Sequence, residues 1–188
     1  MYNIPAVIFA GGKSSRMGTD KALLPFKGMN TLSEFQYQKL SVLFKKVYLS
    51  AKNNKFDFTC TLIKDRYKEC SPLVGIISTF EALESDAIFI LSVDAPLVNE
   101  PIIKHLWETY QENHEMDAII AESPTGIQPL CGIYSRSILP LAKQHLERNN
   151  HRLLSLLQAS NIQTVYFKEE KHFTNLNTPS EYEALIFR

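Results

Sequence analysis

Residues 4–21 read IPAVIFAGGKSSRMGTDK, and this stretch decides the fold. The apolar run Ile4–Ala10 predicts a buried strand, and the glycine pair Gly11 and Gly12 follows it directly. Glycines at the end of a strand allow a sharp turn and leave backbone N–H groups free to face an anion. Three cations follow close behind in the sequence: Lys13, Arg16 and Lys21. The stretch therefore predicts a strand that leads into a loop for the phosphates of a nucleotide.

The spacing of the glycines excludes two familiar phosphate loops. A Walker A loop needs G-x-x-x-x-G-K-[ST], and Val7 stands where its first glycine should be. The dinucleotide motif G-x-G-x-x-G is not matched by Gly11, Gly12 and Gly18. We therefore expect a phosphate loop of another kind, with a basic, solvated strand–helix connection as the alternative.

The composition places the chain among ordinary globular proteins. It has 188 residues, 45% of them apolar and 21% charged, which is enough for one large domain with a substantial core. The formal net charge is zero, so no overall field attracts nucleic acid or an anionic membrane, and neither is expected as a partner.

The cysteines and the apolar runs predict a cytoplasmic protein. The three cysteines show no C-x-x-C spacing, which argues against a disulfide scaffold or a zinc site. The first apolar run lacks the basic flank of a signal peptide, and no run approaches the roughly 20 apolar residues of a membrane span.

Strand-like and helix-like segments alternate along the chain. Strands are expected at Ile4–Ala10, Val47–Ser50, Cys60–Ile63, Ala87–Val93, Ala118–Ala121, Gln128–Tyr134 and Gln163–Phe167. Helices are expected at Thr31–Phe44, Pro72–Leu83, Asn99–Tyr110, Ser137–Leu146, Leu153–Leu157 and Pro179–Ile186. This alternation predicts a three-layer α/β/α, Rossmann-like fold with a mostly parallel sheet, and residues 1–188 are interpreted as a single domain.

A second informative stretch is Ile88–Pro96, in which Asp94 follows an apolar strand. A carboxylate at that place costs free energy unless solvent, a metal ion or a cation meets it. The carboxyl ends of parallel strands share one edge of a sheet, so Asp94 and the glycine loop should face the same cleft. Asp94 is thus a candidate Mg²⁺ ligand, and a turn or capping residue before Pro96 is the alternative.

The first stretch also resembles a known family. Phe9-Ala10-Gly11-Gly12, Ser15-Arg16-Met17-Gly18 and Asp20-Lys21 match the signature L-A-G-G-x-S-x-R-M-G-x-D-K of the MobA-like nucleotidyltransferases. Residues 173–181, FTNLNTPSE, resemble F-x-N-x-N-T-P-E-[DE] of the guanylyltransferases within that family. The resemblance extends from Ile4 to about Leu185.

The resemblance implies a fold of the nucleotide-diphospho-sugar transferase type and a Mg²⁺-dependent reaction. GMP would pass from GTP to the terminal phosphate of molybdopterin, and pyrophosphate would leave. It further implies that the N-terminal part binds the nucleotide and the C-terminal part the acceptor. GTP and molybdopterin are the implied partners, with transient contact to molybdoenzymes or their chaperones.

The roles that the resemblance assigns fall on three groups of residues. The catalytic group is Lys21, Asp94 and Arg16, with Asp94 as the metal ligand. The nucleotide group is Phe9, Ala10, Gly11, Gly12, Lys21, Ser50, Asp65, Pro72, Gly75 and Asp94. The acceptor group is Gln128, Asn175 and Asn177.

Two positions depart from the family pattern. Ser71 replaces the first glycine of G-P-L-x-G, and Ser50 stands where the guanylyltransferases often carry asparagine. An N-cap role is an adequate physical reason for Ser71. Asp65 keeps the family residue, and a surface turn residue is the alternative interpretation of it. The polar loop Arg148–Arg152 is interpreted as a solvated helix connection, and contact with an anionic acceptor is the alternative.

Other activities remain open at the level of the sequence. The same chemistry would serve cytidylyl transfer to molybdopterin or nucleotidyl transfer to a sugar phosphate. A non-catalytic nucleotide-binding maturation factor is a further alternative, although it would have no need of Lys21 and Asp94 together.

Overall fold

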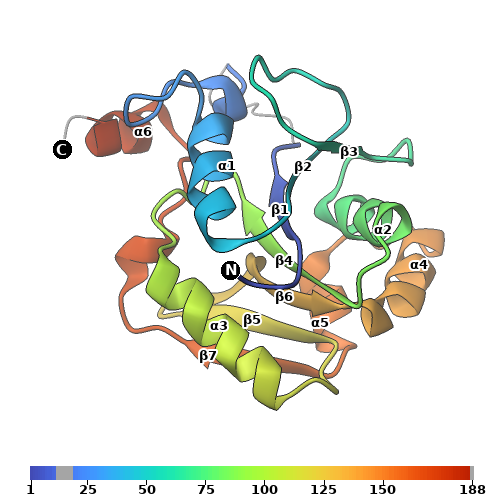
Figure 1. Ribbon diagram of the computed structural model, residues 1–188. Helices are drawn as coiled ribbons and strands as arrows, with labels where there is room; N and C mark the ends of the chain where they lie inside the picture. The colour runs from blue at the N-terminus through green and yellow to red at the C-terminus, as the bar shows by residue number, and fades with distance from the viewer. Residues whose placement is uncertain (12–18, 187–188) are drawn as a thin grey trace.

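A seven-stranded sheet forms the centre of the molecule in the computed structural model, which describes residues 1–11 and 19–186 (Figure 1). Its strands are β1 (Ala6–Phe9), β2 (Val47–Ala51), β3 (Leu62–Lys64), β4 (Ala87–Ser92), β5 (Ala118–Ser123), β6 (Gly126–Ser135) and β7 (Ile162–Tyr166). They lie in the order β3-β2-β1-β4-β6-β5-β7.

Helices cover the sheet on both faces (Figure 1). They are α1 (Leu32–Leu43), α2 (Pro72–Ala82), α3 (Glu100–Glu112), α4 (Leu139–Glu147), α5 (Leu153–Gln158) and α6 (Pro179–Ile186), with short 3-10 turns at Lys21–Leu23, Arg136–Ile138 and Glu170–Phe173. Side chains of α1 and α3 join one apolar cluster, and those of α2, α4 and α5 join a second cluster on the other face. The three-layer α/β/α prediction is therefore confirmed.

The central strands feed alternate side chains into these two clusters. In β4, Phe89 and Leu91 belong to the first cluster, whereas Ile88 and Ile90 belong to the second. This is the two-residue period of a strand that is covered on both faces, and it explains why the run lacks polar alternation.

The direction of β6 decides which of its residues lie at the edge of the sheet where β1, β2 and β4 end. β1 pairs in parallel with β2 and β4, so their carboxyl ends lie together. β6 runs antiparallel to β4, with Cys131 opposite Leu91 and Ser135 opposite Ala87. The first half of β6 is therefore at the edge where β1 and β4 end, and this brings Gln128 toward Asp94.

The helix starts follow the expected capping chemistry. The side chains of Thr31, Ser71 and Asn99 accept backbone N–H bonds at the starts of α1, α2 and α3. At the start of α1 the Thr31 hydroxyl accepts from the N–H of Glu34, and the Glu34 carboxylate accepts from the N–H of Asn30.

Most segment bounds differ from the predicted ones by one or two residues, and two of these differences have a clear physical reason. β3 begins at Leu62 and not at Cys60, because this edge strand pairs on one side only and its ladder with β2 starts there. The expected helix Ser137–Leu146 opens with a 3-10 turn, and α4 starts at Leu139 with Pro140 in its first turn. A proline is tolerated there because the first-turn N–H groups have no partner within the helix.

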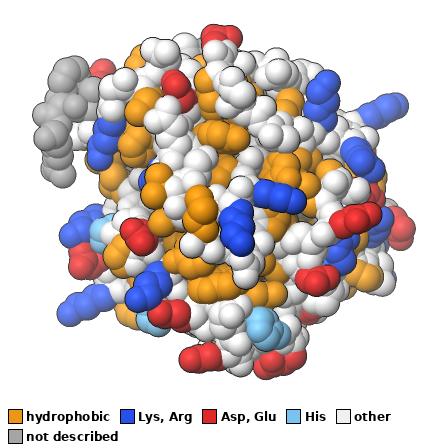
Figure 2. Space-filling model, in the orientation of Figure 1, with side chains coloured by type: hydrophobic (Ala, Val, Ile, Leu, Met, Phe, Trp, Pro, Cys, Tyr) orange, Lys and Arg blue, Asp and Glu red, His pale blue; other side chains and the backbone are white. Residues whose placement is uncertain are grey.

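The surface carries mixed charge. On the face that Figure 2 shows, basic and acidic side chains are interspersed, without a single basic stripe. In the described part of the chain, no helix combines the length and the hydrophobicity needed to cross a membrane.

Candidate functional site

Two adjoining cavities open at the edge where β1, β2 and β4 end. The smaller cavity has a volume of about 150 Å³ and the larger cavity about 430 Å³. Three residues line both of them: Pro72, Ser92 and Leu130. Among the described residues, only these three therefore separate the two cavities, and two ligands can lie side by side in them.

The smaller cavity collects most of the residues that the resemblance assigns to the nucleotide. Its lining includes Phe9, Gly11, Ser50, Asp65, Pro72 and Gly75. Gly75 is there for a steric reason, since a Cβ atom at that position would lie 2.7 Å from Cε2 of Phe9. The absent side chain lets α2 approach β1 closely and sets the position of the Phe9 ring.

A carboxylate stands in the wall of the smaller cavity. The Ser50 hydroxyl donates to Oδ1 of Asp65 at 3.4 Å. Burial raises the pKa of Asp65, while the bond from Ser50 and the charge of Lys52 oppose that rise. A partly desolvated acceptor of this kind favours a ligand that brings N–H or O–H donors.

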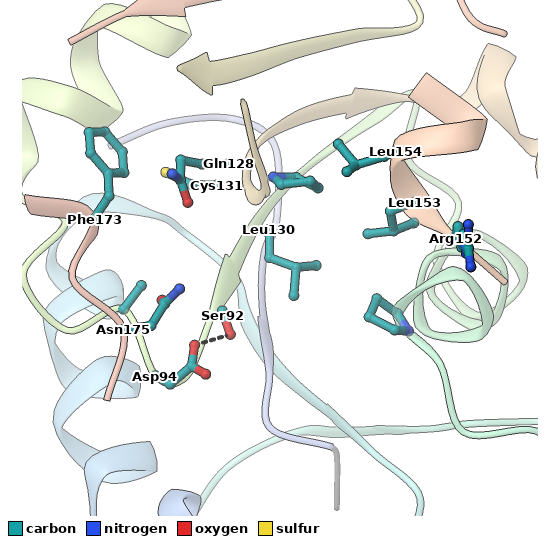
Figure 3. Close-up of a pocket in the computed structure, with 13 residues that line it drawn as sticks. Ser92, Asp94, Gln128, Leu130, Cys131, Arg152, Leu153, Leu154, Phe173 and Asn175 are labelled. Atoms are coloured by element: carbon teal, nitrogen blue, oxygen red, sulfur yellow. Dashed lines mark hydrogen bonds between the residues drawn. The ribbon is translucent and has the colours of Figure 1, made fainter. Parts of the chain in front are cut away.

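The larger cavity is mostly apolar, with polar groups at its two sides (Figure 3). Asp94 and Asn175 lie on one side and Arg152 lies on the opposite side. Among the described residues that line this cavity, Arg152 is the only cation. Gln128 also lines the wall, where its amide donates to the Ser123 hydroxyl at 3.0 Å.

Asp94 is the centre of the polar contacts between the cavities. The Ser92 hydroxyl donates to its Oδ1 at 2.5 Å (Figure 3), and Nζ of Lys21 lies 3.5 Å from its Oδ2. The same Nζ donates to Oδ1 of Asn177 at 2.8 Å. Lys21, Asp94 and Asn177 therefore form one polar group, although they are far apart in the sequence.

The predicted acceptor residues separate into two positions. Gln128 and Asn175 line the larger cavity, whereas Asn177 is not part of its lining and is held on Lys21. The segment that carries the two asparagines is fixed by a backbone bond from Leu176 N–H to the carbonyl of Asp94 at 2.9 Å.

The donor set around Asp94 fits a hard divalent cation. Mg²⁺ in nucleotide sites is commonly held by one or two carboxylates together with substrate phosphates, so a protein cage is not required. Among the described residues, no three carboxylate, histidine or cysteine side chains gather in a potential metal cluster. The partly exposed Asp94 carboxylate beside the Ser92 hydroxyl suits a cation that the substrate also holds.

The remaining predicted positions are placed as follows. Ala10 is buried, and its carbonyl accepts a hydrogen bond from Nζ of Lys55 at 2.9 Å. It therefore lies behind the wall of the site and does not line either cavity. Gly12 and Arg16 lie outside the described residues.

Two functional candidates escaped the sequence reasoning, and the role of a third was left open. Ser92 lines both cavities, and its i, i+2 spacing from Asp94 was the available signal, since such residues share a side of an extended chain. Lys55 pairs with Asp20 and so joins the two ends of the glycine loop, which nothing in its sequence context indicates. For Arg152 the sequence left open a solvated connection and contact with an anionic acceptor, and the structure places this exposed residue in the lining of the larger cavity.

Ser71 has a contact that a glycine could not make. Its hydroxyl caps the N–H of Val74 at 3.4 Å and lies 3.2 Å from Nδ1 of His151. The start of α2 is thereby attached to the loop that precedes Arg152.

Comparison with known proteins identifies the family. The family model described as the MobA-like NTP transferase domain matches residues 6–165. A protein of Campylobacter jejuni named molybdenum cofactor guanylyltransferase is 39% identical over 185 residues, which cover 97% of this chain and 95% of that protein. A Helicobacter pylori protein of the same name is 35% identical and covers 98% of this chain and 92% of its own length.

A solved structure shares the fold. The molybdopterin-guanine dinucleotide biosynthesis protein A of Archaeoglobus fulgidus superposes with a TM-score of 0.82 at 20% identity, covering 98% of this chain and 97% of that one. The similarity in structure shows only the fold, whereas the family model and the two relatives show membership of a family. The chain belongs to the MobA-like NTP transferase family.

Proposed function

We propose that this protein transfers GMP from GTP to the terminal phosphate of molybdopterin and releases pyrophosphate. The observation that carries the proposal is the pair of cavities that share the wall of Pro72, Ser92 and Leu130, with Asp94 beside that wall. The names of the Campylobacter and Helicobacter relatives support GTP and molybdopterin as the substrates.

The smaller cavity takes the guanosine. Phe9 and Gly75 form its apolar side, and Asp65 with Ser50 offers acceptors to the donors of the base or ribose. The triphosphate then extends toward Gly11, the described part of the glycine loop. Gly12 and Arg16 complete the phosphate contacts in this proposal.

The larger cavity takes the acceptor. A pterin is a flat heterocycle with hydrogen-bonding groups around its edge, so the apolar side chains of Leu130, Leu153 and Phe173 can pack against its faces. Gln128 and Asn175 supply hydrogen-bonding groups, and Arg152 supplies a cation for the phosphate.

The chemistry requires little proton transfer. An oxygen of the acceptor phosphate attacks the α-phosphorus of GTP, a new P–O bond forms, and the bond to the β-phosphate oxygen breaks. The protein has to align two polyanions and reduce their repulsion. Lys21 stabilises the negative charge of the leaving pyrophosphate, and Asn177 holds its ammonium in place.

Asp94 would hold the Mg²⁺ that nucleotidyl transfer uses. When bound, Mg²⁺ neutralises phosphate charge and polarises the α-phosphoryl group. The Ser92 hydroxyl fixes the orientation of the Asp94 carboxylate, and Lys21 is its partner in the absence of a metal ion.

We further propose that residues 1–188 act as a single domain in the cytoplasm, where GTP is available. In this assignment the product is passed on by transient contact with molybdoenzymes or their chaperones. Nucleic acid and membranes have no part in the reaction.

Calorimetry with GTP, CTP, ATP and UTP at fixed Mg²⁺ tests the substrate. We expect selective GTP binding that Mg²⁺ strengthens. A preference for CTP would keep the mechanism and reassign the protein to cytidylyl transfer, and saturable binding of a sugar phosphate as acceptor would reassign the other substrate.

Pyrophosphate release tests the enzymatic role. Asp94→Asn should reduce turnover at least 100-fold while it retains Mg²⁺-free GTP binding, since a lost metal contact affects the transferred group. Asp57→Asn is the matched control, because Asp57 is an exposed carboxylate that lines neither cavity. Binding without any pyrophosphate release in the wild-type protein would favour the non-catalytic maturation factor.

A further inference from the structure

Helix α1 carries a row of polar side chains on its inner side. Ser33, Gln36 and Lys39 are spaced by three residues and so lie along one side of the helix. Ser33 and Gln36 are fully buried. The Ser33 hydroxyl donates to the carbonyl of Ala22 at 2.7 Å and so holds the segment that follows Lys21.

The next two members of the row bind the segment that contains Asp94. The side-chain amide of Gln36 donates to the carbonyls of Ser92 and Val93, at 3.2 and 3.3 Å. The ammonium of Lys39 donates to two further carbonyls of the same segment, those of Pro96 at 3.1 Å and Val98 at 2.9 Å. These four bonds attach the backbone on both sides of Asp94 to one rigid helix.

This arrangement is a costly way to support a turn. Among residues 1–11 and 19–186, no carboxylate lies within ion-pair distance of Lys39, so its charge is met by carbonyl oxygens and by the ring of Phe35, whose centroid lies 5.7 Å from Nζ. Burial lowers the pKa of Lys39 to about 7. A half-buried ammonium without a counter-ion is partly desolvated, which destabilises a fold, and an apolar residue on a core-facing helix would not carry that cost. The polar oxygen Oε1 of Gln36 is likewise buried without a hydrogen-bond partner.

The four hydrogen bonds from α1 restrain the backbone that carries the Asp94 carboxylate, in addition to the contacts of the carboxylate itself. Asp94 is bound through its side chain to Ser92 and Lys21, and a metal ion or a phosphate that enters would compete with Lys21 for the carboxylate. The backbone of the segment therefore has to help to keep the carboxylate in place through the reaction. A metal ligand has to stay within about 0.5 Å of its productive position.

We propose that Gln36 and Lys39 are positioning residues that fix the Asp94 segment for metal-assisted transfer. The inference rests on the proposed function of Asp94. The two side chains touch neither cavity, and they act through the carbonyls of residues 92–98.

The test compares Lys39→Met and Gln36→Leu with two matched controls on the outer surface, Lys45→Met and Gln38→Leu, whose native side chains are exposed. Pyrophosphate release is measured against the concentrations of GTP and Mg²⁺. Calorimetry measures GTP binding with and without Mg²⁺, and urea unfolding measures stability.

We expect each inner variant to lower kcat by about 10- to 100-fold, because a small misplacement of a reacting group has effects of that order. KM for GTP should change less than twofold, and the Mg²⁺ concentration for half-maximal rate should rise several-fold. The gain in GTP affinity that Mg²⁺ brings should be lost, and the controls should match the wild type.

Three outcomes decide the inference. Inner variants with a wild-type Mg²⁺ requirement would overturn it, even if kcat fell, because a purely structural defect lowers the active fraction without changing that requirement. If Lys39→Met does not fold, Gln36→Leu carries the same test. If the wild-type protein releases no pyrophosphate, the proposed function fails, and the Mg²⁺-assisted GTP binding of the variants still decides the positioning role.

Discussion

An alanine at position 75 is expected to weaken nucleotide binding more than it weakens the fold. Gly75 lies on α2 against the ring of Phe9, and both residues line the smaller cavity. The new Cβ atom would lie 2.7 Å from Cε2 and 3.0 Å from Cζ of that ring. The ring has to retreat by about 0.7 Å, which is the difference between 2.7 Å and the 3.4 Å at which ordinary contact begins.

The cost to stability should stay small because two effects oppose each other. Overpacking costs about 1–3 kcal/mol, and replacing a helical glycine by alanine returns about 1 kcal/mol. The ring can move into the adjoining cavity of about 150 Å³, which keeps the overpacking near its lower limit. We therefore expect a net change in the free energy of unfolding of at most about 1 kcal/mol. GTP affinity should fall roughly tenfold, or about 1.4 kcal/mol, since the displaced ring occupies the ligand's space.

A double-mutant cycle with Phe9→Leu gives the decisive assay. Leucine lacks the ring atoms that the new Cβ would meet, so Gly75→Ala should cost little GTP affinity in the Phe9→Leu background. Binding is measured by calorimetry and stability by urea unfolding for all four proteins. Wild-type GTP affinity in Gly75→Ala, or additive losses in the double mutant, would refute the steric reasoning.

Three further changes test other parts of the structure. Asp65→Asn should raise stability at pH 7 and weaken GTP binding. Burial raises the pKa of Asp65, so its charged form destabilises the fold at neutral pH, and the stability difference should shrink as the pH falls and vanish below about pH 3.9, the ordinary pKa of an unfolded aspartate. An equal difference at pH 7 and at that low pH would contradict this. Gly132→Ala should cost about 3 kcal/mol or more, since its Cβ would lie 2.5 Å from the backbone carbonyl of Ile119, which cannot retreat, and urea unfolding checks it. Tyr134→Phe should cost about 1–3 kcal/mol, because its buried hydroxyl donates to the carbonyl of Pro129 at 2.6 Å; a thermal midpoint equal to that of the wild type would show that water replaces the bond.

The sequence determined the fold class because its strongest signals are local. The unbroken apolar character of Ala87–Ser92 reflects burial on both faces, and the capping residues Thr31, Ser71 and Asn99 fix three helix starts through bonds within four residues. The glycine pair and Asp94 each follow such a strand, so the rule for parallel sheets was enough to place Gly11 and Asp94 at one edge.

The site could be predicted only in part, because its contacts join residues that the chain keeps far apart. The bond from Lys21 to Asn177 spans 156 positions, and no spacing rule connects them. Arg152, which directly precedes α5, is exposed and lines the larger cavity, although its local sequence is equally typical of a solvated loop. The support of Asp94 by Gln36 and Lys39 is hidden for a similar reason, since polar residues in a helix usually face solvent.

The sequence by itself therefore determined the layers, the glycine at the end of β1 and the strand-end carboxylate, each of which depends on a few neighbouring residues. The tertiary structure alone decided that two cavities share one wall and that α1 holds the Asp94 segment. The antiparallel direction of β6 and the close approach of α2 at Gly75 produced the cavities, and both follow from long-range packing that a linear pattern does not encode.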